Sequence, residues 1–153
     1  MRNKTIILSI FLFLFIGCIG QKIRIGRTVN FLGPKTHIPV YWVDTDIKNY
    51  KYFEINMHTF IFENKIRPGI GGRLGIEKDI NDFSVLFHSG ISLIPNGGDI
   101  PGLAKSPIYG TLRTGARYNP WKIGIFIDHI SSPFHGGKDG DDGKTLFLLE
   151  KEF

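Results

Sequence analysis

The sequence contains a single cysteine, Cys18, among its 153 residues. One cysteine excludes an intrachain disulfide and a cysteine-based metal centre. Apolar residues do not recur at helical spacing for long after residue 20, so a helical bundle is not expected. The chain also lacks a phosphate-binding glycine loop, a GxSxG motif and a metal-spaced cluster of histidine and aspartate. We therefore expect neither a metal nor a cofactor.

The charge of the chain is only mildly positive. The formal net charge is +5, and removing Arg2 and Lys4 with an N-terminal leader would lower it to +3 (5 − 2 = 3). No run of basic residues with interleaved aromatic residues is present. A nucleic acid partner is therefore not indicated.

The N-terminus has the layout of a bacterial export signal. Residues 1–4 are basic, residues 5–16 are almost continuously apolar, and small residues follow up to Gly20. The apolar run is too short to cross a bilayer comfortably. Cleavage would fall either before Cys18, as in a lipoprotein, or after Gly20. Residues 1–20 are thus predicted to be a signal peptide.

The remainder, residues 21–153, is predicted to be one all-β domain. Apolar and polar residues alternate in short segments separated by turn residues, which is typical of strands. The predicted strands cover residues 23–32, 37–45, 52–63, 66–77, 83–94, 108–118, 122–132 and 144–153. Most contain about ten residues, the length that a tilted strand needs to cross a bilayer.

Three features favour an outward apolar face over a soluble barrel or sandwich. The polar face is rich in glycine and arginine and poor in lysine, as suits a crowded interior with paired charges. We expect the pairs to come from Glu54, Glu77, Asp128, Glu150 and Glu152 with Arg67, Arg73, Arg113 and Arg117. The chain ends on an aromatic residue, Phe153. Short connections (46–50, 78–82 and 119–121) alternate with long ones after residues 94 and 132.

These features predict an eight-stranded antiparallel up-and-down transmembrane β-barrel in the bacterial outer membrane. The short connections and both ends of the domain would lie on the periplasmic side. Aromatic residues near strand ends would form the interfacial girdles: Tyr41, Trp42, Tyr118 and Trp121. His58 and His88 would form hydrogen bonds in the interior.

Residues 122–132 (KIGIFIDHISS) carry the candidate site. Three isoleucines, His129 and Ser131 share one face of this strand, because alternate side chains point the same way. The two polar residues would be roughly 6 to 7 Å apart at Cβ. A serine needs a neighbouring base to act as a nucleophile, and that base needs a carboxylate behind it. Asp141 and Asp142, just before the last strand, are the candidate carboxylates. Ser132 or backbone N–H groups near Gly136 and Gly137 would have to stabilise an oxyanion.

The motif His129-Ile130-Ser131 on the penultimate strand of a small exported barrel resembles the PagL-type lipid A 3-O-deacylases. The resemblance covers about the last thirty residues and extends to Asp142-Gly143. It implies a membrane-embedded serine esterase, monomeric or homodimeric, that cleaves an acyl ester of lipid A at the outer leaflet. The family usually has asparagine where this chain has Ser132. Aligning Asp142-Gly143 with the family places Thr145, not a glutamate, at the acid position.

Two alternatives remain open at this stage. In the first, the protein is a non-catalytic outer-membrane barrel with a role in envelope integrity, and His129 and Ser131 are interfacial polar residues. In the second, the chain forms a soluble or periplasmic barrel that buries its apolar face.

Overall fold

The computed structural model describes residues 22–28, 39–50, 52–95, 100–101, 103, 106–132 and 143–153. Its strands are β1 (Lys22–Thr28), β2 (Tyr41–Tyr50), β3 (Phe53–Phe62), β4 (Lys65–Ile80), β5 (Phe83–Leu93), β6 (Ile108–Tyr118), β7 (Ile123–Ser131) and β8 (Gly143–Glu152). A short 3₁₀ helix, η2 (Asn119–Trp121), joins β6 to β7. The predicted signal peptide lies outside the described residues.

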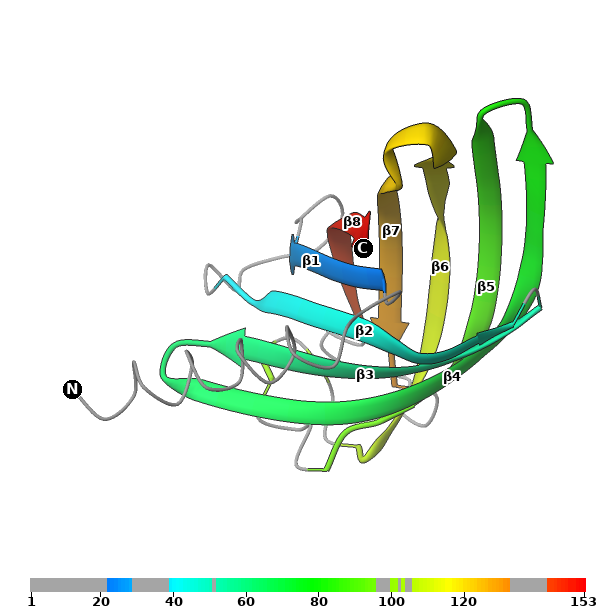
Figure 1. Cartoon of the computed structure of the whole chain (residues 1–153). Coiled ribbons are helices and arrows are strands. Elements are labelled where there is room, and N and C mark those ends of the chain that lie inside the picture. Colours follow the sequence, from blue (N-terminus) through cyan, green and yellow to red (C-terminus); the bar gives the residue numbers. More distant parts are fainter. Residues whose placement is uncertain are drawn as a thin grey trace.

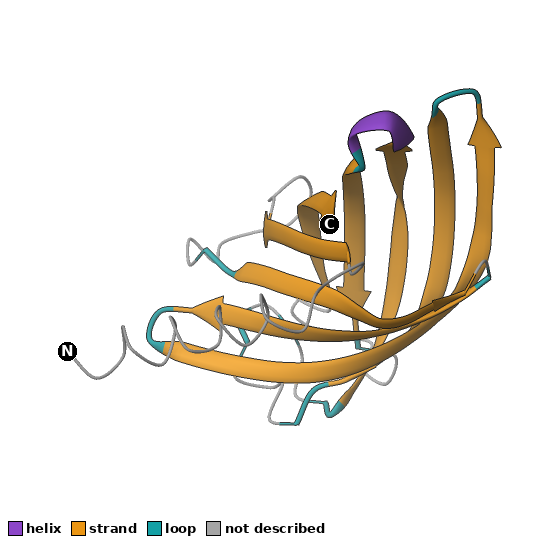
Figure 2. Cartoon of the chain, in the orientation of Figure 1, coloured by secondary structure: helices purple, strands orange, loops and turns teal. Residues whose placement is uncertain are grey.

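The eight strands form a closed antiparallel barrel in which each strand pairs with its neighbours in sequence and β8 pairs with β1 (Figure 1). This confirms the predicted up-and-down topology. Strands make up nearly all of the described chain (Figure 2). Among the described residues, no helix is long and apolar enough to cross a membrane.

The apolar side chains of the strands face outward. On β7, Ile123, Ile125 and Ile127 are exposed, whereas Phe126 and Asp128 are buried. On β4, Leu74 and Ile76 are about two-thirds exposed (65% and 66%). The described strands thus have the arrangement of a transmembrane barrel rather than a soluble one, because a soluble barrel would hide these residues.

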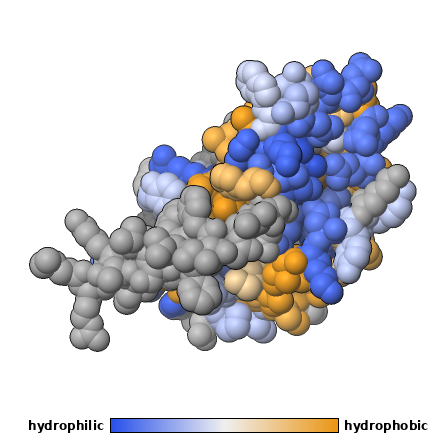
Figure 3. Space-filling model, viewed as in Figure 1, coloured by the Kyte–Doolittle hydropathy of each residue, from blue (hydrophilic) through white to orange (hydrophobic). Residues whose placement is uncertain are grey.

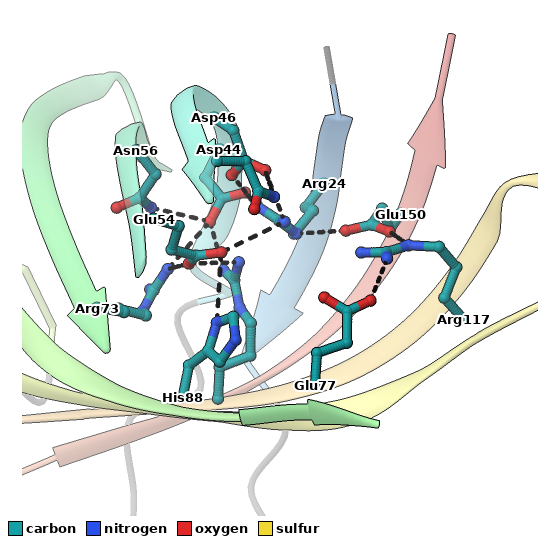
Figure 4. Close-up of polar contacts among 12 residues, drawn as sticks. Arg24, Asp44, Asp46, Glu54, Asn56, Arg73, Glu77, His88, Arg117 and Glu150 are labelled. Carbon is teal, nitrogen blue, oxygen red and sulfur yellow. Dashed lines mark hydrogen bonds and ion pairs between the residues drawn. The ribbon is translucent and has the colours of Figure 1, made fainter. Parts of the chain in front are cut away.

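Ion pairs fill much of the interior (Figure 4). Arg113 on β6 contacts three carboxylates, those of Asp44, Glu54 and Asp128. Arg73 on β4 binds Glu54 at 2.7 Å and Asp128 at 3.2 Å. Because arginine presents several donors in a planar fork, each guanidinium joins carboxylates from different strands. The network therefore ties opposite walls of the barrel together.

A second part of the network centres on Arg24 of β1, Arg117 of β6 and Glu150 of β8 and extends to acids of β2 and β4. Arg117 binds Glu77 at 2.8 Å and Glu150 at 2.5 Å. Glu150 also accepts a hydrogen bond from Nε of Arg24 at 2.7 Å, and Arg24 bonds to Asp46 at the same distance. Arg24, Asp44 and Asp46 were not among the predicted pairs.

Glu152 was predicted to pair with an arginine in the interior, but it lies outside the buried network. Glu152 pairs at the end of the barrel with Lys122, at 3.4 Å, and both side chains are partly exposed. Glu150 has the same parity on β8 and is buried, whereas Glu152 is the last residue of the strand and lies at the rim of the barrel.

Sequence reasoning placed β2 too early. The strand runs from Tyr41 to Tyr50, and residues 46–50, predicted to be a turn, belong to it. Pro39 precedes the strand, as expected of a residue that cannot donate to the ladder. A register shift between Asp46 and Lys48 interrupts the alternation, which hid the strand from a pattern search. Similarly, residues 78–80 belong to β4, and the turn is at Asn81 and Asp82.

Part of the interior is apolar rather than charged. Its buried members lie in or directly beside strands, near the end of the barrel opposite the β2–β3, β4–β5 and β6–β7 connections, and include Trp42, Phe60, Phe62, Ile94, Tyr109 and Ile130. Trp42 was predicted to be part of an interfacial girdle, but this prediction is wrong. Its ring is fully buried and stacks on that of His58, with 4.6 Å between centroids. Tyr41 faces outward instead, because adjacent residues of a strand point to opposite sides.

The two ends of the barrel differ. The end with the β2–β3, β4–β5 and β6–β7 connections is the turn end, and the opposite end is the loop end. Hydrophilic residues gather around the β4–β5 and β6–β7 turns in Figure 3. Exposed aromatic residues lie near the turn end: Tyr50, Tyr52, Phe83, Trp121 and Phe153. Trp121 packs edge-on against Tyr118 with centroids 5.6 Å apart, which forms part of the predicted girdle.

Candidate active site

His129 and Ser131 lie near the loop end of β7, on its outward face. His129 is exposed and Ser131 is partly exposed, and the same face continues toward the turn end as Ile127, Ile125 and Ile123. The strand therefore presents a base and a hydroxyl above an apolar stripe. Within the described chain no hydrogen bond joins the two side chains. In enzymes without substrate, such contacts are often longer than in the reacting complex.

Thr145 on β8 is the cross-strand partner of His129. The Nδ1 atom of His129 lies 3.2 Å from Oγ1 of Thr145, within hydrogen-bonding distance. When Nδ1 carries the proton, it donates to this hydroxyl and Nε2 is left free to accept a proton. The contact is compatible with the tautomer that a general base requires.

The ring of His129 occupies space that only glycine leaves open. A Cβ atom added to Gly143 would lie 2.9 Å from both Cε1 and Nε2 of His129. Gly143 pairs with Ser131, so the edge of the ring that carries Nε2 lies at the level of the serine along the strand direction. The imidazole is therefore held between the Thr145 hydroxyl and the Gly143 backbone.

Ser131 is flanked by glycine on both sides. Its partner on β6 is Gly110 and its partner on β8 is Gly143. The His129 ring occupies the space beside Gly143, whereas beside Gly110 the described residues place only Ser131 atoms near the wall, at 3.8 and 4.0 Å from an added Cβ. Among the described residues, the β6 side of the serine is therefore the side that a neighbouring side chain does not fill.

The predicted acids cannot be placed. Asp141 and Asp142 lie outside the described residues, as do Gly136 and Gly137. In the described part of the chain, no carboxylate forms an ion pair with His129, and Thr145 occupies the cross-strand position behind the imidazole. Ser132 is buried, so its side chain does not share the exposed face of Ser131.

The alignment with the resembling family placed Thr145 at the acid position, but neither its hydroxyl nor the glycines beside Ser131 were assigned a role from the sequence. The signal that reveals their roles is strand register. Gly143 and Thr145 become recognisable as neighbours once β7 and β8 are paired residue by residue, and Gly110 once β6 and β7 are paired.

The other described histidines belong to the interior, as predicted. Nε2 of His58 is 2.7 Å from Oγ of Ser92, and Nδ1 of His88 is 3.5 Å from Glu54. Over the described residues, no three His, Cys, Asp or Glu side chains are grouped so that they could hold a metal ion.

The fold and the outward apolar surface define the class: a small transmembrane barrel of the outer-membrane type. Among solved structures, the chain is similar to the one titled "Crystal structure of the outer membrane enzyme PagL". The TM-score is 0.52 at 8% sequence identity, over 86% of this chain and 99% of that chain. At this identity the likeness concerns the fold. No protein-family model matches the chain, and the search of curated proteins found no match.

Proposed function

We propose that this protein is an outer-membrane serine esterase that hydrolyses an acyl ester of lipid A at the outer leaflet. The observation that carries the proposal is the pairing of His129 and Ser131 on the outward face of β7, with Gly110 and Gly143 beside the serine. The likeness to the fold of an outer membrane enzyme agrees with it. Residues 1–20 would direct export, and the loop end of the barrel would face outward from the cell.

In the proposed reaction, Nε2 of His129 removes the proton of Ser131 as Oγ attacks the carbonyl carbon of the ester. The tetrahedral oxyanion collapses, the sugar hydroxyl leaves with a proton from the imidazolium, and the fatty acyl group remains on the serine. Water activated by His129 then hydrolyses this acyl-enzyme and releases the fatty acid. The net reaction consumes one ester and one water and yields a fatty acid and a sugar hydroxyl, and Ser131 and His129 are regenerated.

Two groups are proposed to support His129. The hydroxyl of Thr145 orients the ring through Nδ1. Asp141 or Asp142 would supply the negative charge that stabilises the imidazolium. Because a neutral hydroxyl stabilises this cation less than a carboxylate does, substitution of the contributing aspartate by asparagine would slow the reaction without abolishing it.

Ser131→Ala tests the proposal in cells. Expression of the wild-type protein should remove one acyl chain from lipid A, seen as a mass loss in lipid A spectra, and Ser131→Ala should leave lipid A intact. Ser89→Ala is the matched control, because Ser89 is an exposed serine on β5. Unchanged spectra with a folded wild-type barrel would contradict the proposal.

A non-catalytic role in envelope integrity is the second candidate. It is favoured by the lack of a carboxylate paired with His129 among the described residues and by an interior filled with ion pairs. This role predicts that loss of the protein weakens the envelope and that Ser131→Ala restores it fully.

A further inference from the structure

Arg27, near the loop end of β1, is a cation on the outward face of the barrel. It shares the parity of Ile25, which is 49% exposed, and Arg27 is itself exposed. Within the described residues, Arg27 forms no ion pair with a carboxylate. This distinguishes it from Arg24 on the same strand, whose guanidinium is buried among four carboxylates.

The surroundings of Arg27 are aromatic. Its guanidinium carbon lies 5.8 Å from the centroid of the Tyr41 ring, and Tyr41 is its partner on β2. On the other side, its partner on β8 is Phe147, which is 41% exposed. The Tyr41 ring thus packs on the guanidinium, the Phe147 ring belongs to the cross-strand neighbour on the other side, and the N–H donors of Arg27 remain available to a group outside the protein.

An unpaired charge on the lipid-facing surface is unfavourable unless an ion of opposite sign lies beside it. The cost falls toward the interface, where headgroups supply such ions. Tyr41 is the first residue of β2, so the Arg27–Tyr41 pair lies at the edge of the apolar wall. Arginine binds phosphate through two parallel hydrogen bonds, which a planar guanidinium fits well.

The strand register relates this cation to the candidate site. Thr145, the neighbour of His129, is two residues from Phe147, the neighbour of Arg27. Arg27 and His129 are thus separated by two strand spacings across the sheet, roughly 10 Å, and by two residues along the strand direction, roughly 7 Å. Both groups therefore lie within the span of one large lipid headgroup.

We infer that Arg27, with Tyr41 and Phe147 beside it, is a binding subsite for the phosphate of an anionic lipid headgroup whose acyl ester reaches Ser131. The subsite rests on the proposed esterase function, since it positions the same lipid. Its cation selects phosphorylated lipids over neutral ones, and its distance from His129 sets which ester lies at the serine.

Binding can be measured without turnover in the Ser131→Ala variant of the full chain. The probes are lipid A with its phosphates and the same lipid A after enzymatic dephosphorylation. Bound lipid is measured by native mass spectrometry from detergent micelles. The phosphorylated lipid should bind about tenfold more tightly than the dephosphorylated one, the range of one charge-assisted contact. Adding Arg27→Gln should remove the preference, and Arg27→Lys should retain part of it.

Lys78→Gln is the matched control, because Lys78 is an exposed cation at the turn end of β4, and it should leave the preference unchanged. Each variant must show the heat-dependent gel mobility of a folded barrel. Equal binding of both lipids by the arginine form, or an undiminished preference in Arg27→Gln, would overturn the subsite. If an equal concentration of inorganic phosphate displaced the lipid, the site would be a general anion site and not a subsite for a lipid headgroup, which would also overturn the proposal. Failure of the wild type to release fatty acid would instead count against the esterase, which this binding assay does not measure.

Discussion

Oγ1 of Thr145 lies 3.2 Å from Nδ1 of His129, across the β7–β8 ladder. Serine hydrolases place a carboxylate at this position relative to the imidazole. A hydroxyl can fix the orientation of the ring, but it both donates and accepts hydrogen bonds and carries no charge, so it does not fix the tautomer as a carboxylate does. In the proposed reaction, Thr145 can therefore orient the imidazole but cannot supply the charge that stabilises the imidazolium.

Thr145→Val should lower kcat about fivefold, because valine has the shape of threonine but accepts no hydrogen bond, and one such bond contributes about 1 kcal/mol. Release of fatty acid from lipid A by the purified variants would measure the effect. Thr145→Ser keeps the hydroxyl and should retain most of the activity. If Thr145→Val is as active as the wild type, the hydroxyl does not orient His129.

Gly143→Ala should displace the ring of His129, because the added Cβ would lie 2.9 Å from Nε2. The Cβ would also lie 2.9 Å from the backbone oxygen of Ile130, so the strand must shift slightly as well as the ring. Activity should fall, and heat-dependent gel mobility shows whether the barrel still folds. Gly110→Ala is the matched change on the other side of Ser131, where the added Cβ would meet the serine at ordinary contact distances of 3.8 and 4.0 Å. A larger loss of kcat in Gly110→Ala than in Gly143→Ala would show that the ring position is not limiting.

Arg113→Leu should destabilise the barrel by about 3 to 5 kcal/mol, since it leaves buried carboxylates without their partner. Asp128 is one of them, with an Nε–Oδ1 distance of 2.6 Å to Arg113. Urea unfolding in detergent, followed by tryptophan fluorescence, would give the change in free energy of unfolding. Arg113→Lys keeps one charge but loses the planar fork, so its loss should be smaller. Equal stability of Arg113→Leu and the wild type would show that the network does not hold the walls together.

Ile125→Arg should cost about 2 to 4 kcal/mol, because it puts a charge on the lipid face of β7 two residues further into the apolar wall than Ile123. Ile123→Arg, at the turn end of the same face, should cost about 0 to 1 kcal/mol near the interface. The two isoleucines have similar exposure, 52% and 42%, so depth in the bilayer is the main difference. Unfolding titrations in lipid vesicles would compare them, and equal costs would argue against a membrane-spanning wall.

The alternation of apolar and polar residues was sufficient to predict the barrel and which side chains of β7 point outward. With a period of two, every side chain of a strand is assigned to one of two faces once the apolar face is known. It failed at β2, where the register shift between Asp46 and Lys48 breaks the period. Trp42 was misplaced because its type suggested an interface, whereas its parity with Asp44 places it inside.

The site could be predicted only in part. His129 and Ser131 share a strand, so their common face followed from spacing within one segment. Thr145, Gly110 and Arg27 lie on other strands, and their relation to the pair depends on register that a single sequence does not encode.

The central claim is that Ser131 cleaves an acyl ester of lipid A. Purified full-length protein in detergent micelles would be incubated with lipid A in water enriched in ¹⁸O, and the released fatty acid would be analysed by mass spectrometry. The wild type should release fatty acid carrying one ¹⁸O atom, and folded Ser131→Ala should release none. No release by the folded wild type, or equal release by Ser131→Ala, would contradict the claim.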